Sequence, residues 1–130
     1  MLKIKKFHDR VRHLINASKE LLPDETIDFY EYRGMAEDKI KDIVKDWRSL
    51  PENSEKYKKF ESAIVYQTAL LLYPSIRNQS IKVKQITGGK VEYFEPEKLQ
   101  NQIQDMLDKL LSDLSKEYST SISYFRLSNI

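Results

Sequence analysis

The residues that could carry chemistry in this sequence are two histidines and a few carboxylates on helical segments. His8 and His13 are five positions apart, which is about 140° around a helix, so they do not form the i, i+4 pair of a helical metal site. We expect both to be surface histidines. Asp105 and Asp108 lie one helical turn apart beside leucines, and this placement favours a solvated helix flank over an acid/base pair.

Motifs that mark enzymes and cofactor sites are missing from the sequence. It has no nucleophile elbow, no P-loop and no dinucleotide-binding glycine motif, and Gly88-Gly89 is too short to cradle a phosphate. It also has no cysteine, which excludes disulfides, thiolate metal sites and cysteine nucleophiles. We therefore predict no catalytic residue, no metal and no cofactor, and we expect that the protein is not an enzyme.

Three lysines lie in the one stretch that leaves helical spacing for strict alternation. Residues 80–94 contain two alternating runs about Gly88-Gly89, and both glycines can adopt the positive φ of a tight hairpin turn. We predict a β-hairpin here, with Lys82, Lys84 and Lys90 on one face. These lysines are our candidates for contacts with DNA phosphates. The alternative is that they protect an exposed strand edge from aggregation.

The composition favours one small, highly charged domain. The chain has 130 residues, of which 40% are hydrophobic and 32% are charged, and it has few glycines and prolines, which argues against an all-β fold. No apolar run approaches the 18 or so residues of a membrane span, and the basic start lacks the apolar core of a signal peptide. We expect a soluble intracellular protein with no membrane association.

The charges are separated into blocks along the chain, although the net charge is only +2. Residues 1–20 carry +4, residues 21–55 carry −5, residues 56–90 carry +6 and residues 91–130 carry −3. Alternating blocks suit self-association, in which the basic face of one subunit meets the acidic face of the next. The alternative is that each block is simply a solvated face.

The first half of the chain predicts two helices. One covers residues 3–22 and ends at Pro23, and the other covers residues 24–48 with Asp24 as its N-cap and Gly34 as a possible break. The apolar positions expected to face the core are Ile4, Phe7, Val11, Leu14, Ile15, Leu22, Ile27, Tyr30, Ile40, Ile43, Val44 and Trp47.

The second half predicts two longer helices. One covers about residues 55–73, with Ser54 as its cap and Pro74 as its stop, and the other runs from Pro96 to about residue 118. The seam expected on the last helix is Leu99, Ile103, Met106, Leu107, Leu110, Leu111, Leu114 and Tyr118. The sequence therefore predicts a mainly α fold over residues 1–118: a small helical bundle of about four helices, with one β-hairpin insertion between the last two helices.

The last twelve residues, 119–130, differ in character from the bundle. Serine and threonine replace most charges, yet apolar and aromatic side chains remain, which is unusual for a disordered tail. We predict a C-terminal docking tail, and the alternative is that it folds back on its own bundle. Its candidate docking residues are Ile122, Tyr124, Phe125, Arg126 and Leu127.

The order of these features resembles a known family. An acidic helix ending in Trp47 leads through a proline-containing loop to the apolar helix at 60–74, which ends in Ala69-Leu70-Leu71-Leu72-Tyr73-Pro74. A hairpin-like insert at 81–94 and a leucine-rich helix follow. Over about residues 24–118 this resembles the head–tail connector proteins (adaptor or head-completion proteins) of long-tailed bacteriophages and prophages. The first 22 residues are longer and more basic than that family leads us to expect.

The resemblance implies a structural part of the virion. It implies a homo-oligomeric ring, expected to be twelvefold and monomeric before assembly in some cases, that lies below the portal and continues the DNA channel. Lys82, Lys84 and Lys90 would then be channel-facing. Its partners would be the portal protein and a tail-side connector or stopper protein, with non-specific contact to DNA. The protein would lie at the head–tail interface, and in the host cytoplasm during assembly. The alternative from the basic segments is a small helical nucleic-acid-binding or regulatory protein.

Overall fold

The computed structural model describes the backbone of residues 1–86 and 96–115, and the side chains of residues 1–77 and 98–115. Its α-helices are α1 (Phe7–Leu14), α2 (Asp24–Ile27), α3 (Met35–Ile43), α4 (Glu55–Ile86) and α5 (Pro96–Leu114). A π-helical turn, η1 (Tyr30–Gly34), precedes α3, and a 3-10 turn, η2 (Trp47–Ser49), follows it. The described residues contain no strand, which confirms the prediction of a mainly α domain of about four helices.

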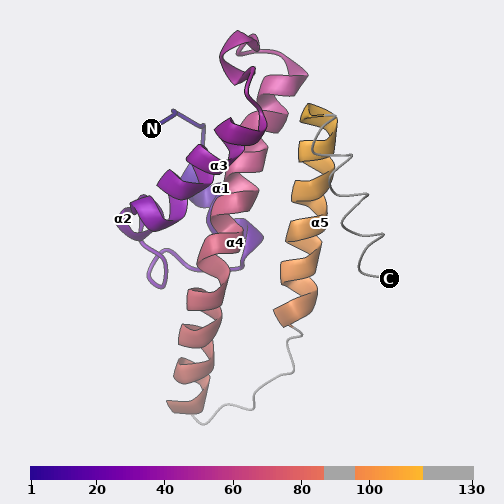
Figure 1. Cartoon of the computed structure of the whole chain (residues 1–130). Coiled ribbons are helices and arrows are strands. Elements are labelled where there is room, and N and C mark those ends of the chain that lie inside the picture. Colours follow the sequence, from indigo (N-terminus) through magenta and orange to yellow (C-terminus); the bar gives the residue numbers. More distant parts are fainter. Residues whose placement is uncertain (87–95, 116–130) are drawn as a thin grey trace, which may run out of the picture.

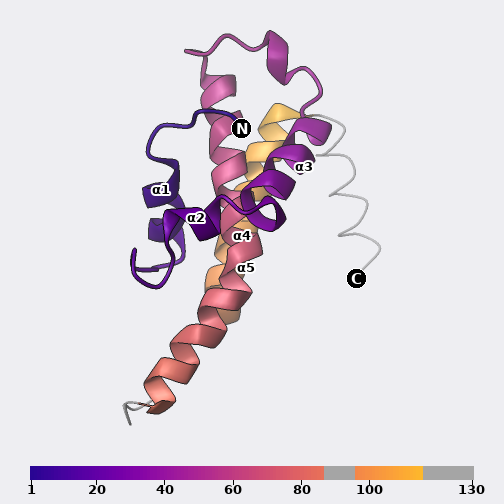
Figure 2. The same cartoon turned by 90° about the vertical axis from the view of Figure 1, so that its left-hand side faces the viewer.

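The long helix α4 is the element on which the others pack (Figures 1 and 2). Helix α5 runs antiparallel beside it, while α1, η1 and α3 contact its first half. Buried side chains of α4, among them Phe60, Ile64 and Leu72, meet Leu107 and Leu111 of α5 in one core. Trp47 stacks on Phe60 with ring centroids 5.5 Å apart, so it closes the core as the sequence indicated.

Helix α1 is shorter than the helix predicted for residues 3–22, because both of its ends adopt left-handed backbone conformations. Lys6 has φ of 56° before the helix, and Asn16 has φ of 54° after it. The amide of Ala17 donates to the Arg12 carbonyl at 3.0 Å, and the amide of Asn16 donates to the His13 carbonyl at 3.4 Å. These two bonds form a Schellman motif, with asparagine in the left-handed position that normally favours glycine.

The helix predicted for residues 24–48 is divided into α2, η1, α3 and η2. Asp24 is not its N-cap: Pro23 occupies that position, and the Asp24 carboxylate bonds to Arg12 instead. Tyr30 was predicted to face the core but is 64% exposed, because the π-helical turn rotates it outward. Its hydroxyl donates to Asp38 at 3.0 Å. Ile40 and Val44 of the predicted face are buried.

Helix α4 begins where the sequence indicated but does not end there. The Ser54 hydroxyl accepts the amide of Tyr57 at 3.1 Å, which confirms the predicted cap. Pro74 was predicted to stop the helix, yet α4 continues through it. Tyr73 and Ile76 are buried on either side of the proline, and this burial offsets the lost hydrogen bond. Figure 2 shows a change in the direction of α4, as expected for a helix with an internal proline.

The predicted hairpin at 80–94 coincides with the end of α4. The backbone of Ile81–Ile86, expected to be the first strand, is helical as far as Ile86, and residues 87–95 lie outside the described part of the chain. The two alternating apolar positions, Ile81 and Val83, are compatible with either structure, so periodicity alone does not decide such a short run. Extending an existing helix needs no new nucleus, which favours helix for the lysine- and glutamine-containing segment.

Helix α5 begins at Pro96, as predicted, and ends at Leu114 rather than near residue 118. Ile103, Leu107 and Leu111 of the predicted seam are buried against α4. Met106 was assigned to the same seam but is 46% exposed. A single packed neighbour covers only a narrow stripe of α5, which leaves Met106 outside it.

Candidate functional site

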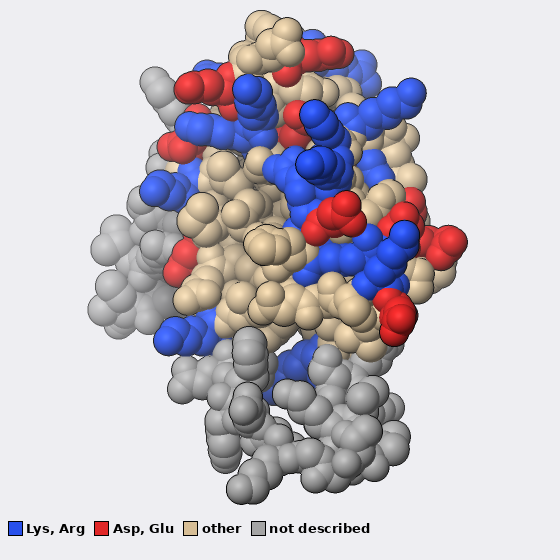
Figure 3. Space-filling view, turned by 180° about the vertical axis from the view of Figure 1, so that it is seen from behind, with Lys and Arg blue, Asp and Glu red and all other residues tan. Residues whose placement is uncertain are grey.

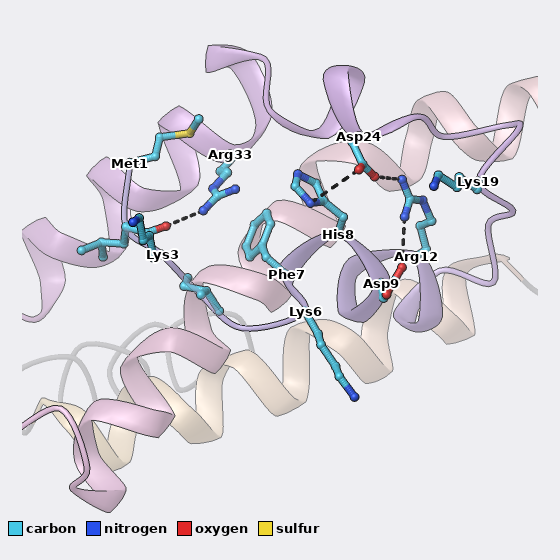
Figure 4. Close-up of a pocket in the computed structure, with 12 residues that line it drawn as sticks. Met1, Lys3, Lys6, Phe7, His8, Asp9, Arg12, Lys19, Asp24 and Arg33 are labelled. Carbon is cyan, nitrogen blue, oxygen red and sulfur yellow. Dashed lines mark hydrogen bonds and ion pairs between the residues drawn. The ribbon is translucent and has the colours of Figure 1, made fainter.

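A cavity of about 490 Å³ lies between the N-terminal segment, α1 and the start of α2. Figure 4 shows that charged side chains from these elements converge around it. The cationic residues that line it are Lys3, Lys6, Arg12, Lys19 and Arg33, of which Lys6 points its side chain away, and the carboxylates are Asp9 and Asp24. Among the described residues this is a dense polar cluster, and we treat it as the candidate site.

Arg12 is buried although it belongs to a short surface helix, and each of its nitrogens has an acceptor. Its Nε donates to the Leu22 carbonyl at 2.8 Å, its Nη1 donates to Asp9 at 3.2 Å, and its Nη2 donates to Asp24. Burial of an arginine is tolerable only when its charge is paired and its donors are satisfied. Arg12 therefore ties α1 to the loop before α2 and to the first turn of that helix.

The hydrogen bond from Arg12 lowers the pKa of the Asp24 carboxyl below its ordinary value. Burial is the next-largest effect and acts in the opposite direction, while the charges of His8, Arg12 and Lys19 lower the pKa further. Asp24 is consequently an anion at neutral pH, and its negative charge is already matched by surrounding cations.

Arg33 is the second buried arginine of the site, and its guanidinium lies 4.1 Å from the centroid of the Phe7 ring. Its Nη1 donates to Asp28 at 3.0 Å, and its Nη2 donates to the Leu2 carbonyl. Buried Glu37 accepts the Leu2 amide at 2.8 Å. Nε of Arg33 lies 3.8 Å from Glu37 and has no hydrogen-bond partner in the described structure.

His8 joins the two arginine clusters. Its Nε2 lies 2.9 Å from Asp28 Oδ1, and its Nδ1 lies 4.0 Å from Asp24 Oδ2. His13 is exposed, and His8 is half-buried with its side chain 29% exposed, so it reaches the surface but is held by two carboxylates. His8 is partly covered because the chain after α1 turns back and brings Asp24 and Asp28 against it. Helical periodicity does not reveal such a contact between segments.

Of the residues that the sequence singled out, His8 lines this cavity, and the predicted DNA-contacting lysines and docking residues are not among its lining residues. Lys82 and Lys84 belong to the last turns of α4, whereas Lys90 lies outside the described residues. The tail candidates Ile122, Tyr124, Phe125, Arg126 and Leu127 are also outside that part of the chain. The channel-facing and docking assignments stay predictions.

Sequence reasoning missed Arg12, Arg33 and Glu37. A signal was available for one pair, because Arg33 and Glu37 have opposite charges at i, i+4, a spacing that brings side chains together on a helix. Arg12 gave a weaker signal as a charge next to the core residue Val11. Asp105 and Asp108 lie on α5, where Gln104 donates to Asp108 at 2.9 Å.

Within residues 1–86 and 96–115, no group of three or more histidines and carboxylates is arranged to hold a metal ion. No helix in the same ranges combines the length and the apolar character needed to cross a membrane. The chain matches no protein-family model, no curated protein and no solved structure.

Proposed function

We propose that this chain is a head–tail connector protein of a long-tailed phage or prophage, acting as a structural adaptor below the portal. The observation that carries the proposal is the antiparallel pair of α4 and α5, which follows the acidic α3 and the proline loop in the order of that family. Figure 1 shows that one end of α4 extends past α5, away from the rest of the bundle.

The extended end of α4 suits contacts with other subunits or with the channel. At 1.5 Å per residue the 32 residues of α4 span about 48 Å, and only its first half is packed by α1, η1 and α3. In this proposal the copies form a ring and Lys82, Lys84 and Lys90 face its lumen. Lysines there contact DNA phosphates without reading sequence.

Residues 119–130 are the proposed docking tail for the portal protein, and a tail-side connector or stopper protein closes the opposite face of the ring. The apolar residues Ile122, Phe125 and Leu127 would anchor the tail. This arrangement places the protein at the head–tail interface of the virion. It assigns no catalytic role and no cofactor to the chain.

Deletion of the gene from the phage or prophage that carries it tests the proposal directly. We expect DNA-filled heads and separate tails, seen by negative-stain electron microscopy, and restoration of tailed particles by the full chain supplied in trans. A chain lacking residues 119–130 should fold but fail to restore them. Normal tailed particles from the deletion strain would contradict the proposal.

The lysine assignment has its own test within the same system. Replacing Lys82, Lys84 and Lys90 together by Gln should leave ring formation intact and impair DNA retention or passage. The matched control replaces Lys45, Lys56 and Lys58, which are exposed and lie outside the extended end of α4. Particles that retain DNA equally well in both variants would remove the lysines from the channel.

A second candidate function, non-specific nucleic-acid binding, is favoured by one surface. The view in Figure 3, from behind, shows lysine and arginine side chains gathered on one face of the molecule. By sequence, residues 1–20 contain six lysines and arginines against two carboxylates, and Arg12 among them is buried. A gel shift that weakens steeply with salt would support this function, and its absence at low salt would remove it.

A further inference from the structure

Three large apolar side chains are exposed together at the π-helical turn η1. Phe29 is 54% exposed, Tyr30 is 64% exposed and Met35 is 47% exposed. Among the residues whose side chains the structure describes, the other exposed large hydrophobic residues are Met1 and Met106. The Met35 amide donates to the Tyr30 carbonyl, so these two residues lie one turn apart. We call Phe29, Tyr30 and Met35 the η1 patch. Scattered apolar residues are ordinary on a surface, whereas a cluster marks a contact with a partner.

The Tyr30 side chain is held in one orientation although most of it is exposed. Its hydroxyl donates to Asp38 at 3.0 Å, and its ring lies so close to Gly34 that an added Cβ would be 2.4 Å from Cδ2. A side chain that is already fixed loses little further freedom when a partner covers it. The π-helical turn that directs Tyr30 outward is itself a rare backbone form, frequent at functional sites.

The exposed charges around the η1 patch are negative. The exposed charged residues within residues 24–38 are Glu25, Glu31 and Asp38. The only cation in that stretch, Arg33, is buried. Farther along α3 the exposed Lys39 is matched by the exposed Asp42, so the surface stays acidic. A partner that covers the η1 patch should therefore combine apolar side chains with positive charge.

The N-terminal segment of the same chain has this character. Residues 1–8 contain no acidic residue, and Met1 is 74% exposed. The exposed cations of the segment are Lys3, Lys5 and Lys6. An apolar residue beside three lysines thus complements an apolar patch beside three carboxylates, in sign and in number.

The two surfaces do not meet within one copy of the chain. The N-terminal segment is fixed, because Glu37 accepts the Leu2 amide at 2.8 Å and Ile4 is buried in the core. Met35 precedes Glu37 by two residues, which is about 200° around a helix, so it faces away from Leu2. The basic segment and the η1 patch therefore lie on different sides of α3.

We propose that the η1 patch binds a second copy of this chain, through residues 1–6 of that copy. The contact joins two different surfaces, so it is head to tail, and repeated contacts of this kind close into a ring when the rotation between copies allows it. The inference deepens the proposed connector role and rests on that role for the ring. It leaves the lysines at the end of α4 uncovered, as that role requires.

The test is sedimentation velocity of the full chain from about 10 μM to about 1 mM. We expect species larger than a dimer as the concentration rises, and their dissociation at about 0.5 M salt. The charge reversals E25K/E31K and K3E/K5E should each weaken association at least about tenfold. The controls E52K/E55K and K45E/K58E change the net charge by the same amounts at exposed positions outside both surfaces, and they should associate as the wild type does.

Two further samples test whether the two surfaces meet each other. An equimolar mixture of E25K/E31K and K3E/K5E should associate again, because each chain keeps one native surface and the two reversed surfaces are also complementary. The variant F29S/M35Q removes apolar contact without changing charge, and it should lose association at every salt concentration. Circular dichroism shows that each variant keeps its helices.

The opposite results are equally clear. A wild-type chain that stays monomeric over the whole range overturns the proposal and leaves the η1 patch to a basic segment of another protein. Charge reversals that behave as their controls do, or a mixture that does not associate, also overturn it. Association that stops at a dimer contradicts the head-to-tail arrangement. The connector role has its separate test, since normal tailed particles from the deletion strain would remove that role and leave the measured contact standing.

Discussion

Arg33 and Glu37 lie one helical turn apart, and both form hydrogen bonds with the backbone of Leu2. Glu37 Oε1 accepts the Leu2 amide at 2.8 Å, and Arg33 Nη2 donates to the Leu2 carbonyl. Both charged side chains are buried, and they form their own ion pair at 3.8 Å. The pair fixes the start of the chain through its backbone, so the contact does not depend on which side chain occupies position 2.

The first prediction concerns this pair. Glu37→Ala should lower the free energy of unfolding by about 3 kcal/mol, because it leaves a buried arginine without one of its carboxylates and the Leu2 amide without its acceptor. Urea denaturation followed by Trp47 fluorescence measures the change. Glu31→Ala, at an exposed position of the π-helical turn, is the control and should change stability by less than about 0.5 kcal/mol. Equal stability of the two variants would show that Glu37 is not part of a stabilising pair.

The second prediction concerns Gly34, which lies under the ring of Tyr30. A Cβ at position 34 would lie 2.4 Å from Cδ2 of Tyr30, so Gly34→Ala must displace the ring and its hydrogen bond to Asp38. We expect a loss of about 1 kcal/mol in the wild type. In a Tyr30→Ala background the same change should instead stabilise by about 0.5–1 kcal/mol, because alanine is the better helix former.

A double-mutant cycle from thermal unfolding measures that reversal. If Gly34→Ala changes the free energy of unfolding in the same direction in both backgrounds, then close packing of Tyr30 is not the reason for glycine at this position.

The third prediction concerns the pH dependence of stability. The Arg12 hydrogen bond lowers the folded-state pKa of Asp24 below its ordinary value of 3.8, so the folded protein binds this proton less tightly than the unfolded chain. The stability that Asp24 contributes is therefore complete above pH 3.8 and is lost as the pH falls through the lower folded-state pKa.

Asp24→Asn should accordingly flatten the acid side of the stability curve while leaving its slope between pH 5 and pH 8 nearly unchanged. Unfolding midpoints measured from about pH 2 to pH 5 test this expectation. A slope below pH 4 that is the same in wild type and variant would mean that Asp24 has no lowered pKa.

The fourth prediction concerns Pro74 inside α4. Pro74→Ala should stabilise the protein by about 1–3 kcal/mol, because it restores one helical hydrogen bond and removes the clash of the ring with the preceding turn. The far-ultraviolet circular dichroism signal should rise at the same time, as α4 straightens. Ser75→Ala, at the next exposed position, is the control and should gain only a few tenths of a kcal/mol. A destabilised Pro74→Ala variant would indicate that the bend of α4 is required by the packing around it.

Signals between residues close in sequence predicted much of the fold correctly. The core stripe containing Phe7, Val11, Ile40 and Val44 follows from apolar residues three and four positions apart. The start of α4 after Ser54 and the start of α5 at Pro96 follow from capping chemistry, which needs only the first turn of a helix. Each of these features is decided within one or two helical turns.

The predictions that failed depend on partners far away in the sequence. Pro74 is a strong local stop signal, but the burial of Tyr73 and Ile76 against the rest of the bundle carries α4 past it. Asp24 has the chemistry of an N-cap, but Arg12 of α1 takes its carboxylate. In both cases a contact between segments outweighs a preference that is worth only a few kcal/mol.

The sequence by itself determined the mainly α fold class, the apolar stripes of the helices and the helix starts that depend on capping residues, because these follow from backbone chemistry and periodicity. Only the tertiary structure decided that Arg12 and Arg33 lie in the interior beside His8, around a cavity with exposed lysines at its ends. Burying an arginine requires carboxylates from several segments at once, and here Asp24, Asp28 and Glu37 supply them. Folding alone brings these groups together.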